Sequence, residues 1–263
     1  MKPYKQTIIL ALSLMLLPLS GFAQTPAEKG LAIAKEIDKR DEGFGDSTAE
    51  LTMTLKNKAG RESYRYIRFK TLEVKGDGDK SLSIFDKPRD IKGTAMLTFS
   101  HPIAQDDQWM FLPALKRVKR ISSRNKSGPF MGSEFAFEDL GSQEVAKYHY
   151  KWMLDEKYNG LDCFVLERRP AYEYSGYTRQ VVWVDKEEYR IQQVEYYDRK
   201  NSLLKTQTFG NYKQYLDKYW RPGHMDMINH QTGKSTKLLW NNYKFRVGLK
   251  ESNFNRNSLK RAR

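Results

Sequence analysis

Short segments of alternating apolar and polar residues follow one another along most of this chain, and they constrain its fold more than any other feature. Alternation over about four to eight residues is typical of a half-buried β-strand, because successive side chains of a strand point to opposite faces. The pattern predicts strands at residues 49–55, 64–69, 82–85, 94–99, 109–112, 148–154, 162–168, 179–184, 191–197, 203–209, 219–228 and 237–245. The intervening turns have the spacing of a meandering antiparallel sheet.

One segment has helical periodicity instead. Residues 25–28, Thr-Pro-Ala-Glu, form a capping box with proline at the first helical position, and glycines at positions 43 and 45 end the helix. Its apolar stripe consists of Leu31, Ile33, Ala34 and Ile37. The helix and the strands together predict a mainly β fold with few helices, in which a large curved sheet has a helix across its concave face. Incomplete cover would leave an apolar cavity, which suits an acyl chain because each buried methylene gains about 0.8 kcal/mol.

The N-terminus has the three parts of a secretory signal peptide. Lys2 and Lys5 precede an apolar run at residues 7–19, and Gly21 and Ala23 occupy the −3 and −1 positions of a cleavage site. The run is shorter than the roughly 20 residues of a membrane span. We therefore expect a signal peptide at residues 1–23, export to the periplasm, and a single mature domain at residues 24–263.

The net charge and the cysteine content limit the classes of binding partner and of chemistry that we expect. The formal net charge of +14 favours an anionic partner such as a phospholipid headgroup, lipopolysaccharide or an acidic protein face, whereas nucleic acid is not expected in the periplasm. The single cysteine, Cys163, cannot form an intramolecular disulfide, and its strand-like surroundings indicate a buried apolar residue rather than a nucleophile.

The sequence offers little for catalysis. The four histidines are scattered, and no His-Glu-x-x-His, Gly-x-Ser-x-Gly or glycine-rich phosphate loop is present. His224 and His230 would share a strand face, but a zinc site needs at least three protein ligands, and the sequence offers no evident third one. Residues 76–79, Gly-Asp-Gly-Asp, lack the rest of a calcium loop and favour a turn. We expect a protein that is not an enzyme and has no cofactor or metal.

Residues 107–140 form the least ordinary stretch, in which an apolar strand leads into a basic run and then a Gly-Pro loop with aromatic residues. The basic run is either a charged edge strand protected against aggregation or a contact for a headgroup or partner. For the second reading the candidates are Arg117, Lys119, Arg120 and Arg124. A short helix is expected from about Ser133. Phe130, Met131, Phe135 and Phe137 would be either core residues or the lining of a lid.

The same stretch resembles the outer-membrane lipoprotein-sorting-like family of the LolA/LolB-like superfamily. The matching segments are Trp-Met-Phe-Leu-Pro-Ala-Leu-Lys-Arg-Val-Lys-Arg-Ile at 109–121, Phe-Met-Gly-Ser-Glu-Phe at 130–135, residues 85–95, and Val-Val-Trp-Val-Asp at 181–185. The resemblance extends over nearly the whole mature chain. It implies an unclosed antiparallel β-barrel with helices covering its concave face and a hydrophobic cavity between them.

The resemblance also implies a function in transport linked to outer-membrane biogenesis. We expect a periplasmic carrier or transporter-accessory protein that binds a lipid or a lipoprotein acyl chain and touches the membrane transiently. The alternative is a non-catalytic adaptor that docks on an inner-membrane transporter of the resistance-nodulation-division (RND/MMPL) type and carries nothing. The expected cavity-lining residues are Leu31, Ile33, Ile37, Leu51, Met53, Trp109, Phe111, Phe130, Met131, Phe135, Phe137 and Trp183.

Overall fold

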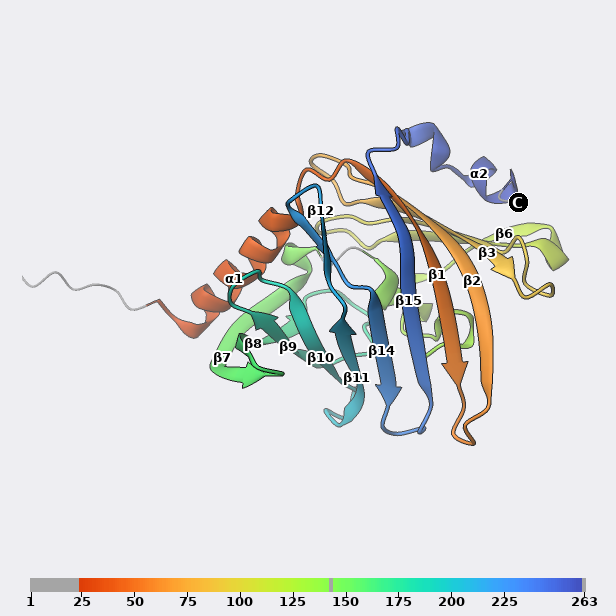
Figure 1. Ribbon diagram of the computed structural model, residues 1–263. Coiled ribbons are helices and arrows are strands. Elements are labelled where there is room, and N and C mark those ends of the chain that lie inside the picture. Colours follow the sequence, from red (N-terminus) through yellow and green to blue (C-terminus); the bar gives the residue numbers. More distant parts are fainter. Residues whose placement is uncertain (1–23, 142–143, 262–263) are drawn as a thin grey trace, which may run out of the picture.

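The computed structural model describes residues 24–141 and 144–261, so the expected signal peptide at residues 1–23 lies outside the described residues. Its main element is a 13-stranded antiparallel sheet in the order β6-β5-β4-β3-β2-β1-β15-β14-β11-β10-β9-β8-β7 (Figure 1). The strands are β1 (Asp46–Lys56), β2 (Glu62–Leu72), β3 (Lys80–Lys87), β4 (Ala95–Phe99), β5 (Asp107–Leu112), β6 (Arg117–Arg120), β7 (Tyr148–Tyr158), β8 (Leu161–Pro170), β9 (Arg179–Asp185), β10 (Ile191–Tyr197), β11 (Leu203–Gly210), β14 (His224–Asn229) and β15 (Ser235–Phe245).

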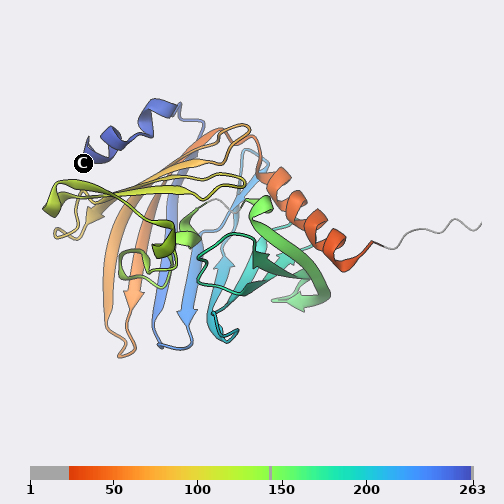
Figure 2. The same ribbon diagram turned by 180° about the vertical axis from the view of Figure 1, so that it is seen from behind.

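The sheet curves strongly but does not close, because β6 and β7 are its two edges and do not pair with each other. Neighbours in the order are mostly neighbours in sequence, and β1 and β15 join the two halves through a long antiparallel ladder. Residues 121–141, which follow the edge strand β6, run across the concave side, and residues 144–147 precede the other edge strand, β7 (Figure 2). The sequence-based prediction of an unclosed, mainly β architecture is confirmed.

The first two predicted strands, at residues 49–55 and 64–69, are confirmed and form a hairpin. Every residue of β1 from Asp46 to Lys56 pairs with one of β2, and the turn closes with the Asn57 amide donating to the Arg61 carbonyl at 3.0 Å. Gly60 has a φ of 81°, a left-handed conformation that glycine adopts without steric cost. The polar turn and the alternating flanks therefore act together to set the register.

The predicted strand at residues 219–228 is wrong in one respect, because it is two strands. β13 (Tyr219–Arg221) pairs with β12 (Lys213–Tyr215) in a separate ribbon, and β14 belongs to the main sheet. Pro222 lacks the amide hydrogen that a central strand needs. A Cβ at Gly223 would stand 2.8 Å from the carbonyl oxygen of Asn211, so only glycine fits where the chain bends.

Helix α1 (Pro26–Asp41) begins as predicted. The Thr25 hydroxyl accepts from the Glu28 amide at 3.2 Å, and the Glu28 carboxylate accepts from the Thr25 amide at 2.8 Å. Its apolar stripe buries Ile33 in the concave core, and the helix packs against β7. Among the described residues, no helix is both long and apolar enough to cross a membrane.

Residues 128–140 fill the concave side of the sheet between β3 and β11, and we call them the plug. Phe130 and Phe135 are almost fully buried in the main core. The short helix expected from Ser133 is wrong in detail, since the plug contains two 3₁₀ turns, Phe130–Gly132 and Phe137–Leu140. Between them the Ser133 hydroxyl accepts from the Phe135 amide at 3.2 Å, which favours a tight turn over a helix.

A second, smaller core lies on the convex face. The C-terminal helix α2 (Arg256–Arg261) and the residues before it cover strands β3 to β5 there, with Phe254 and Leu259 packed on the apolar side chains. The alternation of β4 explains the two cores, because Met96 faces the concave core while Ala95 and Leu97 face the convex one.

Candidate functional site

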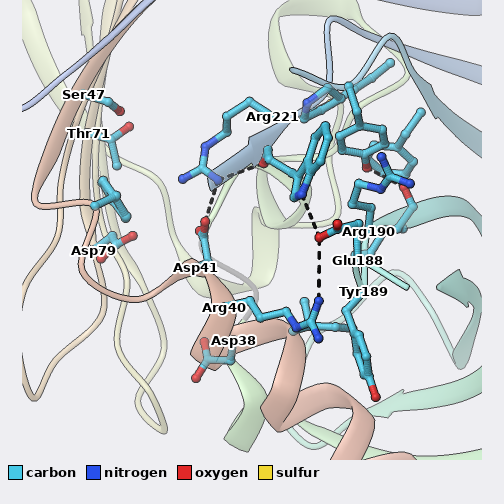
Figure 3. Close-up of a pocket in the computed structure, with 18 of the residues that line it drawn as sticks. Asp38, Arg40, Asp41, Ser47, Thr71, Asp79, Glu188, Tyr189, Arg190 and Arg221 are labelled. Atoms are coloured by element: carbon cyan, nitrogen blue, oxygen red, sulfur yellow. Dashed lines mark hydrogen bonds and ion pairs between the residues drawn. The ribbon is translucent and has the colours of Figure 1, made fainter. Parts of the chain in front are cut away.

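A cavity of about 710 Å³ lies beside the C-terminal half of α1. Its walls come from the first residues of β1, the end of β2, strands β8 to β11, and the β12–β13 ribbon. Figure 3 shows two walls facing each other, with Ser47, Thr71 and Asp79 on one side and Glu188, Tyr189 and Arg190 on the other. The volume is within the usual range for small-ligand sites, which is about 300–1,000 Å³.

The inner walls of this cavity are largely apolar. The concave faces of five strands and of α1 supply Ile37, Phe69, Leu166, Val182, Phe209 and Met225. Trp240 of β15 lies against Phe69, with ring centres 4.9 Å apart. Side chains of these kinds gain free energy when they exclude water from an apolar ligand, at roughly 25 cal/mol per Å² of buried surface.

The rim joins α1 to the second half of the sheet by charged contacts. The Arg40 guanidinium donates to the carbonyl of Glu187 at 3.0 Å and lies 3.8 Å from the Glu188 carboxylate. Its carbon is 4.3 Å from the centre of the Tyr189 ring. The Trp220 indole donates to the same Glu188 carboxylate at 3.0 Å (Figure 3). Arg40 thus holds the last turns of α1 against the β9–β10 turn.

A second rim contact lies one residue further along α1. Arg221 of β13 donates to the Asp41 carboxylate, and the Arg221 side chain is largely buried (Figure 3). Lys218 donates to the carbonyl of Glu42 in the same region. Two cations, Arg221 of β13 and Lys218 of the turn before it, therefore bind the ribbon to the end of α1, one through the Asp41 carboxylate and the other through the Glu42 carbonyl.

Two carboxyl groups in the lining have raised pKa values. Burial, reinforced by the neighbouring charges of Glu144, Asp41 and Glu73, raises the pKa of Asp79 to about 7. Burial and the charge of Glu144 also raise the pKa of Asp38. One wall of the cavity therefore changes its charge near neutral pH.

Arg168 of β8 is the most buried cation in the lining, with 7% of its surface exposed. Its Nε donates to Oε1 of Gln180 on the neighbouring strand at 2.6 Å. Its guanidinium carbon lies 4.8 Å from the centre of the Tyr148 ring. The concave face of β8 thus presents Leu166 and Arg168 side by side to the cavity.

The structure distributes the twelve residues expected from the sequence to line the cavity over several places. Ile37 lines it. Seven others belong to the concave core or pack against it without lining the cavity: Ile33, Leu51, Met53, Phe130, Met131, Phe135 and Phe137. Leu31 of α1 is 38% exposed. Trp109 and Phe111 pack on the convex core, and Trp183 points to the outer face of β9, where it donates to Glu156.

The four basic residues expected to contact a headgroup or partner are exposed and dispersed. Arg117, Lys119 and Arg120 lie on β6, which is an edge of the sheet. Arg120 pairs with Asp107, and Arg124 lies 5.5 Å from the centre of the Tyr174 ring. The edge position agrees with the reading of a charged strand that resists edge-to-edge pairing.

The rim residues Arg40, Glu188 and Arg221 and the buried Arg168 were not predicted from the sequence. An arginine within the apolar alternation Phe164, Leu166, Arg168 was a usable signal, because a charge on an inward position needs a reason. The rim contacts carried no local signal, since their partners are far apart in sequence. Within residues 24–141 and 144–261, no cluster of three or more metal-ligating side chains is present.

Comparisons with family models and solved structures indicate the family to which this chain belongs. A family model whose description reads only "-like: Uncharacterized protein" matches residues 77–261. No curated protein matches the chain significantly. Among solved structures, a domain from Vibrio parahaemolyticus named for outer membrane lipoprotein sorting is 64% identical, with a TM-score of 0.88, and the match covers 89% of this chain and 99% of that one.

Two more distant structures have the same fold. A DUF1329 family protein from Desulfovibrio piger is 30% identical with a TM-score of 0.85, over 89% of this chain and 99% of the other. A LolA superfamily protein from Nitrosomonas europaea is 20% identical with a TM-score of 0.71, over 87% and 98%. With the matching motifs and the unclosed sheet, these findings show that the chain belongs to the outer-membrane lipoprotein-sorting-like family, whose fold is that of the LolA superfamily.

Proposed function

We propose that this protein is a periplasmic carrier or transporter-accessory protein that binds the acyl chain of a lipid or lipoprotein in the cavity beside α1. The observation that carries the proposal is the cavity itself, which combines about 710 Å³ of space with apolar walls. The lipoprotein-sorting name of the Vibrio parahaemolyticus relative supports the same reading. In this proposal the protein performs no chemical step on its cargo.

The proposed binding region differs from the one that the sequence suggested. The plug fills the middle of the concave side with Phe130 and Phe135, so the ligand would lie beside it, against α1 and β8 to β11. The plug is also fastened by polar contacts, with Lys205 donating to the Glu134 carbonyl and the Asp139 carboxylate at 2.8 Å each. We therefore assign the plug to the permanent core and α1 with the β12–β13 ribbon to the movable cover.

A blocked cavity tests the proposal. Thr71 on the concave face of β2 lines the cavity, and its neighbour Lys70 points to the convex face. Thr71→Trp is expected to weaken binding of a fluorescent fatty acid by about tenfold or more, equal to about 1.4 kcal/mol. Lys70→Trp is the matched control and is expected to bind normally. Native mass spectrometry of the gently purified protein should show a bound lipid in the wild type and less of it in Thr71→Trp.

The adaptor that docks on an RND-type transporter without cargo is the competing function, and the filled concave side near the plug favours it. The adaptor function predicts that native mass spectrometry finds no lipid in any sample, and that Thr71→Trp and Lys70→Trp do not differ in fluorescent fatty acid binding. Such a result would remove the carrier proposal.

Membrane contact is the second part of the proposal. The exposed Arg117, Lys119 and Arg120 on the sheet edge, with Arg124 nearby in sequence, would attract anionic headgroups. The fraction of protein that sediments with vesicles containing phosphatidylglycerol should then fall as the salt concentration rises. This fraction should be lower still for the double variant that carries Arg117→Gln and Lys119→Gln. Binding that is unaffected by either change would contradict a role for these residues.

A further inference from the structure

The cavity contains a buried cation that has no carboxylate counter-ion among the described residues. Arg168 is 7% exposed, and none of the ion pairs between residues 24–141 and 144–261 includes it. Its one hydrogen-bond acceptor, the Gln180 amide oxygen, is neutral. Arg168 lines the cavity, so its remaining guanidinium N–H groups are those of a cavity-lining side chain.

Burial of this charge is costly unless something compensates it. An arginine keeps its proton in proteins, so it cannot neutralise itself as a buried lysine or histidine can. The Tyr148 ring at 4.8 Å provides a cation–π contact, which compensates only part of the desolvation. An anion in the adjacent cavity would accept hydrogen bonds from the planar guanidinium in the bidentate geometry that favours arginine over lysine.

The other charges of the lining do not serve this role. Asp41 pairs with Arg221, and Glu188 pairs with Arg40. The remaining acids of the lining are Asp38, Asp79 and Asp217, and Asp217 is exposed to solvent. Asp38 and Asp79 have raised pKa values because of burial and the charges of other acids, Glu144 foremost. An acid that was stabilised by Arg168 would be shifted in the opposite direction. The positive charge of Arg168 is therefore available to a ligand.

Apolar surface lies directly beside this cation. Leu166 precedes it by two residues on the same face of β8, and Val182 is the register partner of Leu166 on β9. Leu140 and Val145 line the same cavity. A positive group next to an apolar strip is complementary to an acidic group at the end of an alkyl chain.

We propose that Arg168 binds the acidic group, a carboxylate or a phosphate, of an anionic amphiphile whose alkyl chain lies against Leu166 and Val182. This inference rests on the carrier function proposed above and names its ligand class. It distinguishes the protein from a carrier that recognises acyl chains alone.

Three ligands with the same chain test the inference: dodecanoic acid, dodecyl phosphate and dodecanol, each displacing a fluorescent lipid probe at neutral pH. The wild type is expected to bind one or both of the acids at least about tenfold more tightly than the alcohol, because hydrogen bonds to charged groups are the stronger kind. Preference for the carboxylate or the phosphate then identifies the acidic group. Arg168→Gln should lose the preference while its affinity for dodecanol changes by less than about twofold.

The matched control is Arg169→Gln. Arg169 is the next residue of β8, points to the outer face, and is 59% exposed at its side chain. It should retain the preference for the acids. Arg168→Lys should retain part of it, because the charge remains and the fork is lost.

The outcomes separate the two proposals. Equal affinity of the wild type for acids and alcohol would overturn the role of Arg168 and leave the carrier function standing. Failure of all three ligands to bind would overturn the carrier function. If Arg168→Gln does not fold, the wild-type comparison of acid with alcohol and the Arg168→Lys variant still decide the matter.

Discussion

Gly30 of α1 lies so close to β7 that a Cβ on it would stand 2.7 Å from the backbone nitrogen of Trp152. The helix and the strand edge therefore touch through their backbones at this point. A glycine inside a helix normally costs about 1 kcal/mol relative to alanine. Here the close approach explains its presence, and it places the rest of α1 over the cavity.

Gly30→Ala should accordingly destabilise the protein instead of stabilising it. Overpacking of this kind costs about 1–3 kcal/mol and exceeds the gain in helix propensity. Chemical unfolding followed by circular dichroism measures the change. Ala32→Gly on the exposed face of the same helix reports propensity alone. A Gly30→Ala protein that is more stable than the wild type would show that the helix does not dock as described.

Arg40 connects the end of α1 to the β9–β10 turn through the Glu187 carbonyl and the Glu188 carboxylate. Arg40→Met should loosen this side of the cavity cover and speed the release of a bound fluorescent fatty acid, as measured by stopped flow. Lys39→Met is the neighbouring control on the exposed surface. Identical release rates for the two variants would mean that the rim contact does not restrain the cover.

Asp79 predicts a pH dependence of stability. Its folded-state pKa of about 7 lies above the ordinary aspartate pKa of 3.8, so the folded state holds the proton more tightly than the unfolded chain does. This contribution to stability is therefore present at low pH and is lost as the pH rises toward about 7. Between about pH 5 and pH 8 the loss should be on the order of 2 kcal/mol.

The Asp79→Asn variant isolates this contribution, since other titrating groups are common to both proteins. The difference in unfolding free energy between Asp79→Asn and wild type should grow in favour of the variant from pH 5 to pH 8. Urea unfolding at several pH values provides the measurement. A difference that does not vary with pH would refute the raised pKa.

Lys205 and Asp139 form a buried ion pair of 2.8 Å that ties the plug to β11. Lys205→Met leaves the Asp139 carboxylate buried without its cation, although the Tyr177 hydroxyl still donates to it at 3.0 Å. Breaking such a pair typically costs about 3–5 kcal/mol. Thermal unfolding should show the loss, and hydrogen exchange should show faster exchange in residues 128–140.

A surface pair provides the comparison for that variant. Lys237 lies 3.5 Å from Asp226 and is 49% exposed at its side chain. Lys237→Met should change stability by less than about 1 kcal/mol, as exposed ion pairs usually do. Equal effects of Lys205→Met and Lys237→Met would mean that the plug is not held by its buried pair.

Local sequence was sufficient for most of the secondary structure. The capping box at Thr25 and Glu28 and the alternation in β1 and β2 depend on neighbours within a few residues, and both predictions are confirmed. The same alternation explains why β4 sends Met96 to one core and Leu97 to the other. Periodicity failed where a proline and a glycine, Pro222 and Gly223, interrupt the ladder, and it did not predict β12 or the C-terminal helix α2.

Which apolar residues surround a cavity was decided by tertiary structure alone. Phe130 and Ile37 look equally suited to a lining in the sequence, yet the plug buries Phe130 completely while Ile37 faces the cavity. Alternation determines the face of a strand on which a side chain lies, but the segment that covers that face comes from a distant part of the chain. The presence of a charged residue at position 168 can be read from the sequence alone. That no carboxylate of the described segments forms an ion pair with it follows only from the packing of α1, β7 and β9 around it.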